Sequence, residues 1–177
     1  MELKDLLIKR RSCRCYSGEK VETETLKRII EKATLAPSAC NSQPWFLTAV
    51  NDPEKVKEIA KATHVFGSNA FSENAGAFIV IEQREAKLKD GVVKLVGSKY
   101  FADNDIGIIT GYLTLSAFDE GVESCVLGLF DKKAVKKALD MDKNAEIKLL
   151  LCLGYAGEND KIWDKKRKSL EEVSKFI

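Results

Sequence analysis

Two short stretches of this sequence carry side chains that could bind a ligand. The first, "APSACNSQPWF", covers residues 36–46 and has no charged residue, although 32% of the chain is charged. It holds two primary amides, Asn41 and Gln43, and each carboxamide offers a hydrogen-bond donor and an acceptor. Such amides can match a neutral ligand edge on which acceptors and donors alternate, and Pro37 and Pro44 would stiffen the loop that presents them. An amide-stapled turn without a ligand is the alternative.

The second stretch, "KRRSCR", places arginines on both sides of Ser12. Forked guanidinium donors beside a hydroxyl suit a phosphate monoester, whereas a solvated basic face is the simpler interpretation. Neither a P-loop nor a G-x-G-x-x-G motif is present, so side chains would have to hold the phosphate. Taken with the amide loop, this predicts a cofactor with a phosphate and a heteroaromatic head. The carbonyl, N–H, carbonyl edge of a flavin is one such head.

Composition argues against chemistry carried by the protein's own side chains. The chain has one histidine, His64, and five cysteines without a C-x-x-C spacing, so neither a zinc site nor a histidine-based triad is expected. Unpaired thiols and the lack of a signal sequence favour a cytoplasmic protein. A net charge of +2 gives no case for a nucleic-acid or membrane partner. If this is an enzyme, a cofactor supplies the chemistry.

Hydrophobic periodicity predicts one domain over residues 1–177, of the α/β or α+β class, with four or five strands. Thr23, Asp52 and Asp131 are expected to cap helices. Residues 105–120 are apolar around most of a helix, so the sheet, a second subunit or both should bury them. Expected helices cover 2–10, 23–36, the segment from 53, 105–120 up to a stop at Gly121, and a short basic segment after 131; a less regular basic fragment lies within 87–101. Expected strands cover 45–50, 76–82, 122–130 and 146–156.

Five blocks in order, "RRSCRCYS", "APSACNSQPWFL", "DIGIITGYLTLSAFDEGVESCVLGLF", "LCLGYAGE" and "KRKSLEEV", resemble the flavin-dependent nitroreductase family. The resemblance covers nearly the whole chain. It implies an α+β fold with a mixed, mostly antiparallel sheet of four to five strands flanked by helices. It also implies a domain-swapped homodimer that binds FMN across the subunit interface, with 105–120 as the central dimer helix. The implied activity is transfer of hydride from NADH or NADPH, through FMN, to a small-molecule acceptor.

The resemblance also implies which residues bind FMN. The N-terminal block would contact phosphate and ring, with Arg14 stabilising negative charge on the reduced ring. The amide loop would come from the other subunit, and the backbone near Leu129 would face N5. No catalytic side chain and no metal are implied, because the flavin carries the reaction. The residues so assigned are Arg10, Arg11, Ser12, Arg14, Pro37, Ser38, Asn41, Gln43, Leu127, Gly128, Leu129, Lys165 and Arg167.

Several alternatives stay open at this point. The acceptor could be a nitroaromatic, a quinone or a related electrophile, and ping-pong kinetics are expected. Reductive dehalogenation, enone reduction or flavin fragmentation would use the same fold. A non-catalytic flavin-binding or redox-sensing protein belongs to a different class, as does a dimer without cofactor. Residues 64–102 cannot be matched to the family one by one, and Cys13 and Cys15, which flank Arg14, are interpreted as packing residues.

Overall fold

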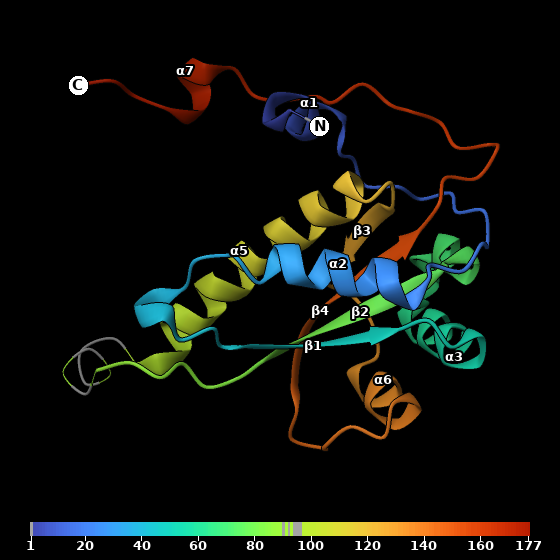
Figure 1. Ribbon diagram of the computed structural model, residues 1–177, viewed down its shortest axis with the longest axis horizontal. Helices are drawn as coiled ribbons and strands as arrows, with labels where there is room; N and C mark the ends of the chain where they lie inside the picture. Colours follow the sequence, from blue (N-terminus) through green and yellow to red (C-terminus); the bar gives the residue numbers. More distant parts are fainter. Residues whose placement is uncertain (1, 90, 92, 94–96) are drawn as a thin grey trace.

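A four-stranded sheet with helices on both faces organises the computed structural model, which describes residues 2–89, 91, 93 and 97–177 (Figure 1). The strand order is β1-β2-β4-β3, and all three strand pairings are antiparallel. One isolated parallel bridge, Ser12 to Ser124, extends the sheet beyond β3. The fold is therefore α+β, and the expected number of strands is confirmed.

The strands are β1 (Trp45–Val50), β2 (Ala77–Gln83), β3 (Glu123–Leu127) and β4 (Glu146–Gly154). The α-helices are α1 (Leu3–Lys9), α2 (Thr23–Ala33), α3 (Pro53–Thr63), α5 (Ser98–Asp119), α6 (Lys132–Ala138) and α7 (Leu170–Val173). Among the described residues, three 3₁₀ turns cover Ala39–Asn41, Val65–Gly67 and Ala70–Asn74.

Each face of the sheet packs against its own pair of helices. The first five residues of β2 are a continuous apolar run because both faces of the strand are covered, and all seven of its residues, including Glu82 and Gln83, are buried. One face contributes Phe78 and Val80 to a core with α3 and α6, and the other contributes Ile79 and Ile81 to a core with α2 and α5. Figure 1 shows these helix pairs on opposite sides of the sheet.

Helix boundaries and one cap differ from the sequence-based expectation, and α2 ends at Ala33 instead of residue 36. α5 begins at Ser98, well before residue 105, because its first turns are too polar to reveal an apolar face. Glu22 occupies the N-cap position of α2, so Thr23 is not the cap; its hydroxyl accepts a hydrogen bond from Asn51 Nδ2 at 3.0 Å. The caps at Asp52 and Asp131 and the turn at Gly121 are confirmed. The centre of the fragment expected within 87–101 lies outside the described residues.

The N-terminal segment is held against the sheet by long-range contacts. Tyr16 is buried, and its hydroxyl donates to the Cys152 carbonyl at 3.2 Å. Gly154 allows this approach, because a Cβ there would lie 2.8 Å from the Tyr16 ring. Gly157 N–H donates to the Cys15 carbonyl at 2.9 Å. The chain before Tyr16 is thereby fixed between β3 and the segment that follows β4.

Candidate cofactor site

Alternate side chains of residues 10–15 point to opposite sides of an extended segment. The Cys13 N–H donates to the Ser124 carbonyl at 3.0 Å, which keeps this backbone strand-like beside β3. Successive side chains of extended backbone face opposite ways. Ser12 and Arg14 are exposed, whereas Cys13 is fully buried. The outward set, Arg10, Ser12 and Arg14, thus forms a face that can meet a ligand.

Arg11 belongs to the inward set and is bound to two carboxylates. Its Nε and Nη2 lie 3.2 and 3.0 Å from Glu123 Oε1, and Nη2 also forms an ion pair with Asp160. The hydrogen bond that Arg11 donates to Asp160 is the largest of the effects that raise the pKa of Arg11 above its ordinary value. These partners differ from those expected of a phosphate ligand.

The outward arginines have no such partners. The structure gives Arg10 and Arg14 no ion pair with a carboxylate among the described residues. Both lie close enough to Cys125 on β3 for their charges to act on the pKa of its thiol. Burial still raises that pKa, so this thiol stays protonated. Two cations beside β3 therefore keep their charge available for an anion.

Two predicted phosphate ligands from the C-terminal segment approach the same region. Lys165 Nζ donates to backbone carbonyls at the end of α1, those of Leu7 at 3.3 Å and of Ile8 and Arg10. Desolvation, and then the charges of Arg10 and Arg167, lower the pKa of Lys165. The ammonium thus caps a helix C-terminus. Arg167 is exposed and donates to the carbonyl of its neighbour Lys166 at 2.9 Å.

The amide loop is shaped by its own hydrogen bonds. Ser38 Oγ accepts from the Gln43 N–H at 2.9 Å, and Gln43 Nε2 donates to Asn41 Oδ1 at 3.1 Å. Both amide residues are exposed and adopt positive φ, 51° at Asn41 and 48° at Gln43, as does Cys40 at 53°. Consecutive residues with positive φ are unusual outside glycine and mark a backbone held by its surroundings. Pro37 is exposed beside them.

Asp105 anchors this loop to α5. Its carboxylate is buried and accepts the Ala39 N–H at 3.2 and 3.3 Å. Sequence reasoning did not single out this residue, although an acid at the start of an otherwise apolar helical stretch was a usable signal.

The substitution Asp105→Asn should remove one source of the pH dependence of the free energy of unfolding. Burial raises the pKa of Asp105 above its ordinary 3.8, only partly offset by the Ala39 N–H. The folded state thus holds this proton more tightly than the unfolded state. The stabilisation that comes from binding the Asp105 proton is fully present below pH 3.8 and is lost as pH rises through the raised pKa of the folded state. Urea unfolding from pH 3.5 to 7 should show wild type losing stability relative to Asp105→Asn; parallel curves would contradict this. The control Asp105→Ala should be about 1 kcal/mol less stable than Asp105→Asn at every pH, because the Ala39 N–H then lacks an acceptor.

The loop and the N-terminal segment lie near opposite ends of α5 (Figure 1). Ala39 contacts Asp105 in the first half of this helix, whereas Ser12 pairs with Ser124, which follows the helix. From Asp105 to the helix end the axis rises about 22 Å, at about 1.5 Å per residue. One chain therefore does not bring Asn41 and Gln43 next to Arg14.

The predicted N5-facing segment follows β3 directly. Leu127 is buried at the end of the strand, and Gly128 and Leu129 are exposed. Asn69 Nδ2 donates to the Leu129 carbonyl at 3.1 Å and ties the turn to the chain after α3. Gly128 has no side chain to cover its backbone, and a Cβ there would meet only Leu149 Cδ2, at 3.8 Å, among the described residues.

The buried thiols of Cys13 and Cys152 are poorly suited to chemistry. Burial raises the pKa of Cys13 to about 11, and burial also raises that of Cys152. A protonated, buried thiol is a weak nucleophile. No cluster of three potential metal ligands is found in the described part of the chain.

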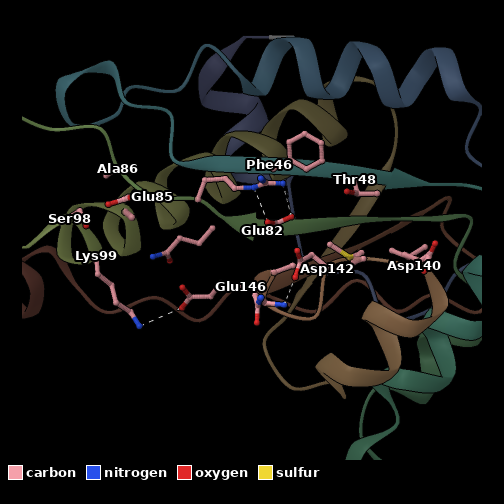
Figure 2. A pocket seen from close by; sticks show the side chains of 17 residues that line it. Phe46, Thr48, Glu82, Glu85, Ala86, Ser98, Lys99, Asp140, Asp142 and Glu146 are labelled. Carbon is pink, nitrogen blue, oxygen red and sulfur yellow. Dashed lines mark hydrogen bonds and ion pairs between the residues drawn. The ribbon is translucent and has the colours of Figure 1, made fainter.

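A cavity of about 670 Å³ lies elsewhere (Figure 2). It opens between the edge of β1, the end of β2, the start of α5 and the segment before β4. Figure 2 shows Lys99 and Glu146 reaching toward each other across it, and they form a 3.5 Å ion pair. None of the residues predicted to bind FMN lines it. We give more weight to the N-terminal segment, because its cations and the Ser12 hydroxyl fit a phosphate.

A model of the nitroreductase family matches residues 7–155. The chain belongs to the nitroreductase family. This confirms the resemblance read from the five sequence blocks, and with it the class of enzyme, an oxidoreductase of the nitroreductase type.

Relatives and solved structures agree with this assignment. The chain is 32% identical over 157 residues to an Archaeoglobus fulgidus protein named as a candidate NADH dehydrogenase/NAD(P)H nitroreductase, covering 85% of this chain and 83% of that protein. It is 30% identical to a Thermus thermophilus NADH dehydrogenase, covering 89% and 88%. Its fold is similar to that of a candidate nitroreductase from Exiguobacterium sibiricum solved with FMN, with a TM-score of 0.85, 22% identity, and coverage of 100% and 98%. Within the described residues, no helix has the length and apolar character needed to cross a membrane.

Proposed function

We propose that this chain is an FMN-dependent oxidoreductase that takes hydride from NADH or NADPH and delivers it to a small electrophile such as a nitroaromatic or a quinone. The observation that carries the proposal is the outward face of the N-terminal segment. Arg10, Ser12 and Arg14 lie there in alternation beside β3, and the two arginines lack carboxylate partners in the described structure. Cations left uncompensated beside a hydroxyl fit a phosphate ester.

Each part of this site has a role that its surroundings support. Arg10 and Ser12 would hold the phosphate, with Arg167 and the nearby charge of Lys165 adding to the local field. Arg14, one position further along the same face, would lie by the ring. When bound, FMN accepts hydride at N5 and passes it on, so donor and acceptor would use the site in turn. Gly128 and Leu129 would offer backbone groups to the ring.

We further propose a homodimer in which the amide loop of the second copy completes the site. The separation of the loop from the N-terminal segment along α5 supports this. Apolar side chains also remain uncovered on α5, with Ile108 37% and Tyr112 39% exposed. The C-terminal segment ends in exposed apolar residues, Phe176 and Ile177, consistent with an arm that a partner covers.

The visible absorption spectrum of the purified protein, before and after anaerobic NADH or NADPH, tests the function. Flavin bands that bleach within seconds would support the oxidoreductase and identify the nicotinamide. Bands that persist would favour a flavin-binding or sensing protein. A colourless protein that takes up no added FMN would refute the proposal. Steady-state assays with a nitroaromatic, a quinone, a conjugated enone and a halotyrosine would then separate nitroreduction from the related reductions and from dehalogenation.

A further inference from the structure

We infer that Arg11, Glu123 and Asp160 form a positioning triad that fixes the ligand-binding face of the N-terminal segment, and that Arg11 itself does not bind the cofactor. This inference rests on the proposed function. It assigns Arg11 a role different from the one the family resemblance implies. The triad joins three distant parts of the chain: the N-terminal segment, the start of β3, and the segment after β4.

The first argument is geometric. The extended backbone of residues 10–15 places Arg11 on the side opposite Arg10, Ser12 and Arg14. On that side the Arg11 side chain is 16% exposed, with Glu123 at 14% and Asp160 at 9%. A guanidinium covered in this way cannot turn to the outward face without breaking both ion pairs.

The second argument concerns charge. One guanidinium faces two carboxylates, so the triad carries a net charge of −1 if all three groups are ionised. A phosphate brought to Arg11 would meet Glu123 and Asp160, and like charges at such distances repel. Arg10 and Arg14 present the opposite situation, because they lack carboxylate partners in the described residues. Within the same motif, Arg11 is thus engaged in ion pairs within the protein, whereas Arg10 and Arg14 remain available to a ligand.

The third argument is that the triad contacts the backbone on which Arg10 and Ser12 lie, and can therefore orient these two residues. Asp160 lies on the inward side of the N-terminal segment, where its Oδ2 is also 3.8 Å from Cys13 Sγ. Glu123 directly precedes Ser124, whose carbonyl accepts the Cys13 N–H. Arg11 therefore braces the backbone between its two outward neighbours, Arg10 and Ser12. Loss of the brace should disturb contacts to the phosphate and to the ring together.

Binding of FMN and of riboflavin, which lacks the phosphate, tests this directly. For Arg11→Met we expect both affinities to fall by a similar factor, roughly tenfold, so that the FMN-to-riboflavin ratio stays near the wild-type value. Glu123→Gln should weaken both ligands in the same way. The double variant should be little worse than Arg11→Met alone, because the two residues act as a unit. Arg11→Lys should recover only part of the affinity, since an ammonium lacks the guanidinium fork.

A matched control is Arg28→Met, which removes an arginine paired with Glu120 at 2.7 Å on the outside of α2. It should leave both flavin affinities unchanged. All titrations are run where circular dichroism shows the variants folded.

The other outcomes overturn the inference in distinguishable ways. A loss confined to FMN, not reproduced by Glu123→Gln, would make Arg11 a phosphate ligand. A shift in urea unfolding with unchanged flavin affinities would make the triad purely structural. Wild-type protein that binds no FMN would refute the proposed function, and the positioning role would fall with it. In the first two cases the wild type still binds FMN, so the inference alone fails.

Discussion

Replacing Arg14 with methionine is expected to slow the reduction of bound flavin by NADH or NADPH by roughly 100-fold, the effect of removing one preorganised donor to developing charge. Arg14 is exposed on the ligand-facing side of its segment, and no carboxylate of the described structure neutralises it. Its charge is thus available to a ring that becomes negative on reduction. Anaerobic stopped-flow absorbance, at saturating FMN and nicotinamide, measures the rate.

The control for this prediction is Arg10→Met, two residues earlier on the same face. It should weaken FMN binding about tenfold or more, as expected for a lost charged hydrogen bond, and leave the reduction rate at saturating FMN nearly unchanged. Arg14→Lys should retain much of the rate, because it keeps the positive charge. An Arg14→Met protein that reduces its flavin at the wild-type rate would show that this charge does not act on the ring.

The second large effect is expected from Gly111→Arg on α5. A Cβ added at Gly111 or at Gly107 would meet nothing within 4 Å in the described chain, so the isolated subunit can accommodate a side chain there. In a dimer packed through this helix, two arginines would be buried without partners at a cost of several kcal/mol. We expect the dissociation constant of the dimer to rise by roughly 100-fold or more and the bound FMN to be lost.

Size-exclusion chromatography with light scattering, combined with flavin content, measures both quantities. Circular dichroism should show a folded subunit, which separates loss of assembly from loss of fold. Glu58→Arg, on the exposed side of α3, introduces the same residue away from α5 and should leave a dimer with FMN. A Gly111→Arg protein that remains a dimer with full flavin would place the interface elsewhere.

Much of the fold could be predicted because local patterns agreed with global packing. The apolar run at 76–82 became a strand buried on both faces, and the Asp52-Pro53 pair opened α3 with the expected cap. The start of α5 could not be predicted, because the polar first turns show no apolar periodicity. Helix caps were predictable where the acid bonds to its own helix, as at Asp131, and not at Thr23, whose hydroxyl bonds to Asn51 instead.

The candidate site shows the same limit at the level of single residues. Consecutive arginines read as one phosphate-binding cluster, but an extended backbone sends Arg10 and Arg11 to opposite sides. The partners that occupy Arg11 lie far along the chain, Glu123 at a separation of 112 residues. No local pattern could indicate that Asp160 would lie beneath Cys13. The family was therefore predictable from the sequence, whereas the different contacts of the neighbouring arginines were not.

The attachment of the N-terminal segment also constrains the order of events during synthesis on the ribosome. Residues 10–16 emerge first, yet their hydrogen-bond partners, such as the carbonyl of Cys152, are 136 residues away. Contacts of such high sequence separation slow folding, because a long loop must close before they form. Until these partners are synthesised, the arginines of the N-terminal segment lack their native contacts. Because Cys152 lies on β4, between β2 and β3 in the sheet, a product truncated before this strand would lack both part of the core and the anchor of the N-terminal segment.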